Sequence, residues 1–161
     1  MTFPSHDDIS KECTLLLCDI AEVQLSGMDQ KSAYALYSTV LYAFSLISTR
    51  LQQPISVAGE LAQFEEEYRN DILFICVSLL NHLVTKDLQL LLDDGNAFPS
   101  NLSNSFSKKL IPEVLLNGLD MVVSVLTPEI LKRFPATADR YFRFVMCICD
   151  VYILHYGALL Y

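Results

Sequence analysis

Apolar residues recur at intervals of three and four along almost the whole chain, and no stretch alternates apolar and polar side chains. This spacing is the feature that most limits the possible folds, because it places apolar side chains on one face of successive helices. The segment from Glu60 to Val84 carries the widest stripe of this kind. Its members are Leu61, Phe64, Tyr68, Ile72, Ile75, Leu79 and Leu83, with Leu73, Cys76 and Leu80 beside them. The sequence therefore predicts an all-α protein.

Cap and turn residues divide the chain into further helices. Asp29 and Thr127 are residue types that cap helix N-termini, and Pro128 suits the first helical position. Gly27 closes the first helix, as glycine commonly does after a helix C-terminus. The predicted helices span residues 7–23, 29–51, 60–84, 112–126 and 135–155, with short helical pieces over 86–92 and from residue 127.

The same spacing predicts which residues of the other helices face inward. For the first helix these are Ile9, Cys13, Leu16, Leu17 and Ile20, and for the second Ala33, Tyr37, Val40, Phe44, Ile47 and Leu51. After residue 112 they are Leu115, Leu119, Val122, Val123 and Leu126, followed by Ala138, Tyr141, Phe142, Val145, Ile148, Cys149 and Tyr152.

The chain has 161 residues, which predicts one domain over 1–161. Two helical pairs are expected, 29–51 with 60–84 and 108–126 with 135–155. Degenerate helix pairs with wide apolar faces indicate an α-solenoid of HEAT type, and the length would hold about three to four repeats. A compact helical bundle is the alternative. Residues 93–107 collect Asp, Gly, Asn, Pro and Ser, and we expect them to form a flexible loop.

The charge balance points away from nucleic acid. Lys and Arg number 11 against 19 Asp and Glu, which gives a net charge of −8, whereas binding to a phosphate backbone needs clustered cations. Four acids, Glu65, Glu66, Glu67 and Asp71, are the candidate protein-binding residues, as an acidic surface for a basic partner. A solvated helix face explains the same four residues.

No arrangement of residues predicts catalysis. The five cysteines are odd in number and irregularly spaced, which indicates reduced, mostly buried thiols in a cytosolic or nuclear protein. On one helix Cys147 and Cys149 point about 200° apart, so they cannot share a tetrahedral metal ion. His82 is expected to be a hydrogen-bonded core histidine. The sequence contains no phosphate-binding glycine loop and no hydrolase motif, so we expect no enzyme activity, no cofactor and no metal.

A membrane-embedded helical protein is a second alternative, because 18 residues between Lys31 and Arg50 carry no charge. As a helix they would extend roughly 27 Å, close to the thickness of a bilayer core. Six serines and threonines interrupt this stretch, however, and residues 141–161 include Arg143 and Asp150, which are expensive in hydrocarbon. We therefore expect no membrane insertion.

One segment resembles a known family. Residues 127–135 read TPEILKRFP and residues 136–145 read ATADRYFRFV. This resembles a late HEAT repeat of the exportin-4 branch of the importin-β-like nuclear transport receptors (karyopherins). In that branch a helix ends in Leu-x-x-Phe-Pro and the next opens toward a pair of aromatic residues, here Tyr141 and Phe142.

The resemblance extends over residues 29–152, and the exportin-7 branch is its nearest alternative. The motifs that precede the repeat are AYALY at 33–37, YRNDIL at 68–73, LLNHLVTKD at 79–87 and EVLLNGLD at 113–120. Residues 1–30 match poorly. After Tyr152 the family would continue with a proline-containing turn and another repeat, so we expect the chain to be a section of a longer receptor or a truncated product.

The resemblance implies a function in nuclear export. Receptors of this branch bind protein cargo together with Ran in its GTP form, pass nuclear pore proteins, and release cargo in the cytoplasm after GTP hydrolysis. A hypusine-bearing translation factor is among their cargoes. The implied location is the nucleus and cytoplasm, between which the receptor shuttles. The part that chiefly grips Ran has no counterpart in this chain. A stand-alone helical adaptor would share the fold without these partners.

Overall fold

Helices make up all the regular structure in the residues that the computed structural model describes, 6–93 and 107–157, with side chains placed for 9–25, 27–29, 31–85 and 113–150. The all-α prediction is therefore confirmed for these ranges. The helices are α1 (His6–Val23), the 3-10 helix η1 (Leu25–Gly27), α2 (Gln30–Leu51), α3 (Glu60–Asp93), α4 (Ser107–Val125), α5 (Pro128–Arg133) and α6 (Pro135–Gly157).

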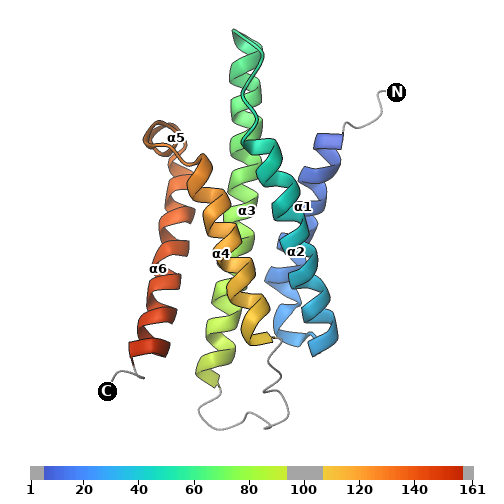
Figure 1. Cartoon of the computed structure of the whole chain (residues 1–161), viewed down its shortest axis with the longest axis vertical. Coiled ribbons are helices and arrows are strands. Elements are labelled where there is room, and N and C mark those ends of the chain that lie inside the picture. The colour runs from blue at the N-terminus through green and yellow to red at the C-terminus, as the bar shows by residue number, and fades with distance from the viewer. Residues whose placement is uncertain (1–5, 94–106, 158–161) are drawn as a thin grey trace.

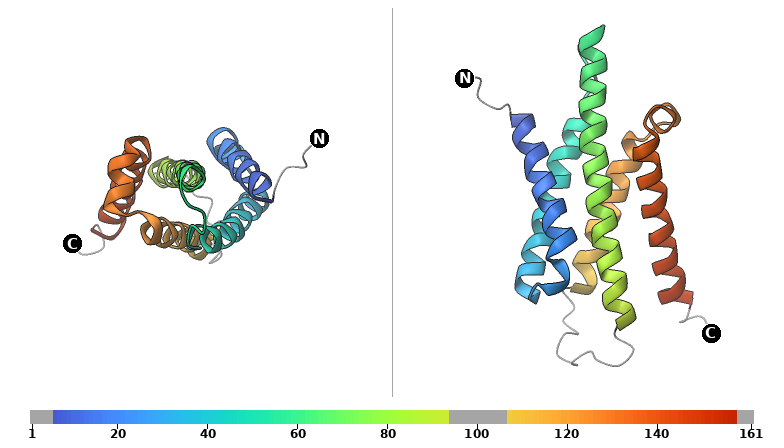
Figure 2. Two further views of the ribbon diagram at one scale, coloured as in Figure 1. Left: turned by 90° about the horizontal axis from the view of Figure 1, so that it is seen from above. Right: turned by 180° about the vertical axis from the view of Figure 1, so that it is seen from behind.

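The five long helices lie in two layers (Figures 1 and 2). One layer holds α1, α3 and α6, with α3 packed against both of the others; the second layer holds α2 and α4, which pack side by side. Figure 1 shows that α1, α3 and α6 run in one direction and α2 and α4 in the opposite direction. Each of the two connected pairs α1–α2 and α3–α4 therefore contributes one helix to each layer.

This arrangement corrects the predicted helix pairs. We expected 29–51 to pair with 60–84 and 108–126 with 135–155. Instead α2 has its closest neighbour in α4, and α6 has its closest neighbour in α3. The periodicity of a helix shows which face is apolar, but several helices of this chain offer compatible faces, so periodicity does not identify the partner.

The helix ends agree with the cap residues, with two differences. Asp29 accepts a hydrogen bond from the backbone N–H of Ser32 (2.8 Å), and Thr127 accepts one from Ile130 (3.3 Å). The predicted short piece over 86–92 is wrong as a separate helix, because α3 continues unbroken to Asp93. The fourth long helix begins at Ser107, before Pro112 rather than at it. Of the predicted loop 93–107, residues 94–106 lie outside the described part of the chain.

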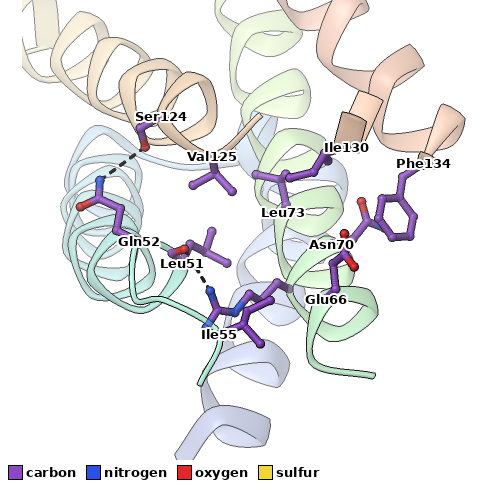
Figure 3. Close-up of a pocket in the computed structure, with 11 residues that line it drawn as sticks. Leu51, Gln52, Ile55, Glu66, Asn70, Leu73, Ser124, Val125, Ile130 and Phe134 are labelled. Atoms are coloured by element: carbon purple, nitrogen blue, oxygen red, sulfur yellow. Dashed lines mark hydrogen bonds between the residues drawn. The ribbon is translucent and has the colours of Figure 1, made fainter. Parts of the chain in front are cut away.

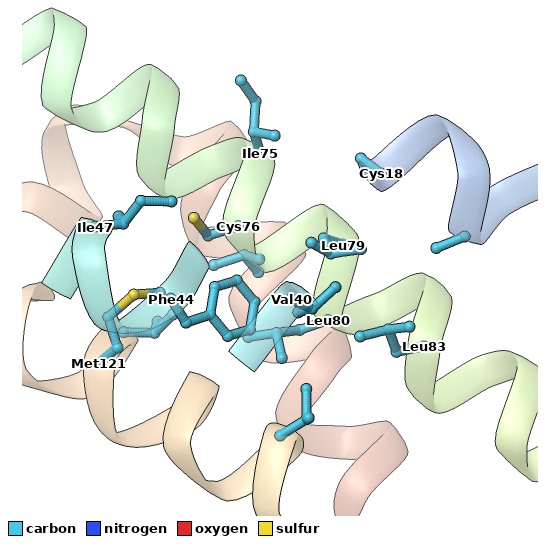
Figure 4. Packing of buried hydrophobic residues seen from close by; sticks show 14 of the residues in the cluster. Cys18, Val40, Phe44, Ile47, Ile75, Cys76, Leu79, Leu80, Leu83 and Met121 are labelled. Atoms are coloured by element: carbon cyan, nitrogen blue, oxygen red, sulfur yellow. The ribbon is translucent and has the colours of Figure 1, made fainter. Parts of the chain in front are cut away.

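The core is centred on the middle of α3. Residues 72–84 of this helix are buried on nearly every side, as expected for a helix with neighbours all round it. Figure 4 shows Leu80 of α3 beside Phe44 of α2 and Met121 of α4. The buried apolar side chains of α2 are Leu36, Tyr37, Val40, Phe44, Ile47 and Leu51. The predicted inward face of α2 is thus confirmed for five of its six residues, and Ala33 is partly buried against the core.

Four predicted inward faces are wrong in part. In α1 the core-facing residues are Thr14, Cys18 and Ala21, whereas Ile9, Cys13 and Leu16 are exposed. The other predicted inward residues that are exposed are Leu61 and Phe64 in α3, Val123 in α4, and Phe142 and Cys149 in α6. In α6 Phe144 is fully buried instead. The side chain of Tyr152 lies outside the described part of the structure.

Two side-chain hydrogen bonds hold α6 to α3. Thr137 donates from Oγ1 to Oδ1 of Asn70 (2.8 Å), and Asn81 donates from Nδ2 to the carbonyl oxygen of Arg140 (2.9 Å). Thr137 is almost fully buried, so its hydroxyl needs this partner. The two bonds fix both the distance and the axial position of α6 along α3.

Candidate functional site

The four acids predicted as a protein-binding surface lie on the first three turns of α3. Asp71 accepts from Nζ of Lys11 on α1 (2.8 Å), and Glu66 pairs with Arg133 on α5. Glu67 accepts a hydrogen bond from Gln63 within α3 (3.0 Å). At least two of the four charges are therefore neutralised by cations from neighbouring helices. The role of the four acids as a docking surface stays a prediction, and two of them, Asp71 and Glu66, join α3 to α1 and α5.

Glu65 is the centre of a partly buried ion-pair network. It accepts from Nε of Arg69 (2.8 Å) and from Nη2 of Arg50 (3.3 Å). Arg69 also donates from Nη1 to the carbonyl oxygens of Gln53 (2.5 Å) and Leu51 (3.4 Å). One guanidinium thus satisfies carbonyls at the C-terminal end of α2, where no intrahelical N–H is available, and its positive charge suits that end of the helix dipole.

A cavity of about 350 Å³ opens beside this network (Figure 3). It lies where the C-terminal ends of α2 and α4 meet α3 and α5. Its walls are mostly apolar, from Leu51, Ile55, Leu73, Val125, Ile130 and Phe134, with Gln52, Glu66, Arg69, Asn70 and Ser124 as polar lining residues. A second cavity of about 220 Å³ lies along the loop after α2, and Ile55 and Arg69 line both.

Each polar side chain that lines the larger cavity has a hydrogen-bond or ion-pair partner. Ser124 donates to the carbonyl oxygen of Met121 (2.7 Å) and accepts from Nε2 of Gln52 (3.4 Å). Asn70 accepts a hydrogen bond from Thr137. Glu66 pairs with Arg133, and Arg69 pairs with Glu65. The cavity therefore presents a mostly apolar lining, with polar residues that already have hydrogen-bond or ion-pair partners.

Neither a protein-family model nor a solved structure significantly matches the chain.

Of the five thiols two are exposed, two are buried and Cys147 is intermediate, so the prediction of mostly buried thiols is wrong in part. Cys13 and Cys149 are exposed, whereas Cys18 and Cys76 are buried on facing helices. Burial raises the pKa of Cys76 to about 12, with a smaller effect of neighbouring Cys18. Burial also raises the pKa of Cys18 to about 11, assisted by Asp19 and Glu22. Both thiols therefore stay protonated at neutral pH and are poor nucleophiles.

Two further observations bear on ligands and membranes. Among the described residues, no three His, Cys, Asp or Glu side chains gather as metal ligands. His82 is partly buried, with Nε2 3.9 Å from Oε2 of Glu22. None of the helices, over the residues searched, is both long and apolar enough to cross a bilayer.

Exposed apolar stripes on the two end helices are the feature that sequence reasoning missed. On α1, Ile9, Leu16 and Val23 are about half to three-quarters exposed at intervals of seven residues. On α6, Phe142 and Met146 are similarly exposed. These residues were assigned to the core or not assigned. The available signal was that α1 carries apolar residues around most of its circumference, more than one neighbour can cover.

Proposed function

We propose that the chain is a HEAT-type α-solenoid segment of a nuclear export receptor and that it acts by binding protein cargo. The observation that carries the proposal is the two-layer order, in which α1, α3 and α6 run parallel in one layer and α2 and α4 in the other. Antiparallel pairs stacked with equivalent helices side by side are the arrangement typical of helical repeat proteins. On this count α1–α2 and α3–α4 are two repeats and α6 begins a third.

The exposed stripes at both ends support a stack that continues. α1 and α6 lie at opposite edges of their layer and each packs against one neighbour there, α3. Inner repeats of a solenoid bury such faces against the next repeat, whereas capping repeats present polar outer faces. In a closed bundle of five helices, Leu16, Val23, Phe142 and Met146 would stay exposed to water, and large exposed apolar patches are rare on monomeric proteins.

The export role rests on the resemblance over residues 29–152, centred on Phe134-Pro135 and Tyr141-Phe142. Structural support for that register is limited to the short helix α5, which ends at Arg133 before Phe134, and α6, which starts at Pro135. The proposed partners are protein cargo, with Ran-GTP and nuclear pore proteins bound through the full-length receptor. The proposed location is the nucleus and the cytoplasm.

Dependence on the nucleotide state of Ran tests this function. The natural protein is immunoprecipitated from cell extract supplemented with Ran loaded either with a non-hydrolysable GTP analogue or with GDP. We expect Ran and a set of proteins to be retained with the GTP analogue and lost with GDP. Retention that ignores the nucleotide, or no retention of Ran, contradicts the export role and favours the adaptor.

Substitutions in the exposed apolar stripe of α1 test whether a further repeat packs against this helix. Leu16→Glu with Val23→Glu is introduced into the natural protein, beside Lys132→Glu with Glu129→Lys at exposed positions of α5. In a continuing stack the first pair enters a buried interface, so the melting temperature in cells should fall clearly, while the second pair changes it little. Equal, small effects of both pairs would mean that the stripe faces water, as in a closed bundle.

A further inference from the structure

The outer face of the layer formed by α2 and α4 exposes large apolar and aromatic side chains. On α2 these are Tyr34, Tyr42 and Leu46, and on α4 they are Leu116 and Val123, each between 45% and 65% exposed. The two helices pack side by side, and Nε2 of Gln52 on α2 bonds to Oγ of Ser124 on α4 (3.4 Å). With Gln52 beside Ser124 and the two helices running in the same direction, Tyr42, Leu46, Leu116 and Val123 lie at similar heights on neighbouring helices, whereas Tyr34 lies farther toward the start of α2. This surface of α2 and α4 is separate from the end stripes of α1 and α6.

Removing the α2 half of this surface from water costs little desolvation free energy. The helix carries no charge from Ser32 to Thr49, so no ionic group has to be desolvated there. Three of its exposed hydroxyls already donate to the helix backbone: Thr39 to Ala35 (2.7 Å), Ser45 to Tyr42 (2.7 Å) and Thr49 to Ser45 (3.0 Å). Uncharged surface with exposed tyrosines is typical of the centres of protein interfaces.

The α4 half adds two negative charges. Glu113 and Asp120 are exposed, and among the side chains that the structure places no cation pairs with either. At 100° per residue, they lie about 20° and 40° around α4 from Ser124, the residue bonded to α2. Leu116 and Val123 lie farther round in the same sense. The acids therefore lie on the side of α4 that is next to α2, between that contact and the exposed Leu116 and Val123.

We propose that this α2–α4 face binds an amphipathic helix of a protein partner, one with an apolar stripe flanked by Lys and Arg. The apolar stripe would cover the tyrosines and leucines, and the cations would meet Glu113 and Asp120. The spacing of seven residues between Leu116 and Val123 matches two turns of an apposed helix. The inference rests on the proposed function in that the occupant is a protein cargo, and it assigns the surface and chemistry of its binding.

Charge favours this occupant over a second copy of the chain. In a two-fold contact across this face, Glu113 and Asp120 of one copy would approach the same acids of the other, because such an interface is self-complementary. Like charges brought together in a partly desolvated interface disfavour the contact. A basic helix gains from the same acids. The chain as a whole carries a net charge of −8, which assists the approach of a cationic partner.

A synthetic amphipathic helix of leucine and lysine, labelled with a fluorophore, is the probe. A peptide with glutamate in place of lysine is its control, and binding to the purified full chain is followed by fluorescence anisotropy. We expect the lysine peptide to bind and the glutamate peptide not to bind. The double variant Glu113→Lys with Asp120→Lys should weaken binding about tenfold or more, since two surface ion pairs become repulsions.

Matched variants control for net charge and for folding. Glu12→Lys with Glu60→Lys makes the same change of charge at exposed positions of α1 and α3 and should leave binding within about twofold. Tyr42→Ser with Leu116→Ser should weaken binding, while Phe142→Ser on α6 should not. Far-ultraviolet circular dichroism checks that each variant folds. Equal loss in the charge-matched control Glu12→Lys with Glu60→Lys, or no loss in the α2–α4 variants, overturns the proposal.

Two other outcomes are separable from these. Concentration-dependent dimerisation that Leu46→Lys abolishes would assign the face to a second copy and overturn the basic-helix occupant. Retention of cargo that depends on Ran-GTP and is unchanged by Glu113→Lys with Asp120→Lys would overturn this surface while leaving the export role intact. If retention of cargo does not depend on Ran-GTP but the lysine peptide still binds to the α2–α4 face, the export role is overturned and the assignment of this surface stands.

Discussion

Gly118 of α4 packs directly onto Leu80 of α3: a Cβ atom at position 118 would lie 2.5 Å from Cδ2 of Leu80 and 2.9 Å from the ring of Phe44. Both neighbours are buried in the core. This contact between the two layers sets how closely α4 approaches α3. The absence of a side chain at 118 is thus a packing requirement and not a matter of backbone conformation.

Gly118→Ala is therefore expected to destabilise the protein. Alanine improves helix propensity by about 1 kcal/mol, but overpacking a closed core typically costs about 1–3 kcal/mol. We expect a net loss in the free energy of unfolding, measured by urea denaturation. Gly27→Ala is the control, because a Cβ there meets nothing within 4 Å. A stabilised Gly118→Ala protein would show that Leu80 and Phe44 move aside freely.

The sequence predicted helices better than it predicted their neighbours. Periodicity identified the inner face of α2 because its inward positions are all apolar, whereas its outward positions mix serine and threonine with exposed aromatic and apolar residues. It failed for α1, where Thr14 is buried together with Cys18 and Ala21 and its hydroxyl donates to the carbonyl of Ser10 (2.7 Å). A polar residue satisfied in this way carries no hydrophobic signal, so the pattern selected Leu16 instead.

The candidate site shows the same limit. The four acids on α3 were recognisable as a cluster, but the cations that neutralise two of them come from distant parts of the chain. Lys11 lies 60 residues from Asp71, and Arg133 lies 67 residues from Glu66. Only the packing of α1 and α5 against α3 reveals that these charges are paired, and local spacing does not encode that packing.

Arg69 is expected to be the most sensitive cation of the chain. Its side chain is 13% exposed and joins Glu65 to the carbonyls of Leu51 and Gln53, so Arg69→Met removes one partner of the partly buried Glu65 carboxylate and the side-chain donor to both carbonyls. We expect a loss of about 2 kcal/mol in the free energy of unfolding. Arg69→Lys should not restore it, because an ammonium group cannot span the same acceptors.

Arg143→Met provides the matched comparison for Arg69. Arg143 also pairs with a carboxylate four residues away, Asp139 (3.0 Å), but its side chain is 70% exposed. Exposed pairs of this kind contribute about 0.5 kcal/mol or less. Similar losses for Arg143→Met and Arg69→Met in urea denaturation would contradict the capping role of Arg69.

The buried thiols predict a defined response to alkaline pH. An unfolded thiol ionises near 9.0, whereas burial holds the pKa of Cys18 at about 11 and of Cys76 at about 12. A group whose pKa is raised by folding stabilises the folded state below the unfolded pKa and loses that contribution as pH rises. We expect the free energy of unfolding to fall between pH 9 and 12, and to fall less steeply in Cys76→Ala.

Thiol labelling checks the same assignment at neutral pH. A disulfide reagent should modify Cys13 and Cys149 in the folded protein, and Cys18 and Cys76 only after unfolding, as read from labelled peptides by mass spectrometry. Fast labelling of Cys76 in the folded state would show that α1 opens from α3. An unchanged alkaline slope in Cys76→Ala would remove this thiol from the pH dependence.

Asp29, the N-cap residue of α2, predicts how the free energy of unfolding responds to acidic pH. Its hydrogen bond from Ser32 lowers the pKa of the carboxyl group below 3.8. A group whose pKa is lowered by folding contributes stability above its unfolded pKa and loses it as pH falls through the folded value. We expect Asp29→Ala to lower the free energy of unfolding at neutral pH, while Asp29→Asn retains most of it because asparagine also caps. Because asparagine does not titrate, any advantage of the wild type over Asp29→Asn should shrink as pH falls below 3.8. A difference that stays constant across this range in urea denaturation would show that the cap does not depend on the charge of Asp29.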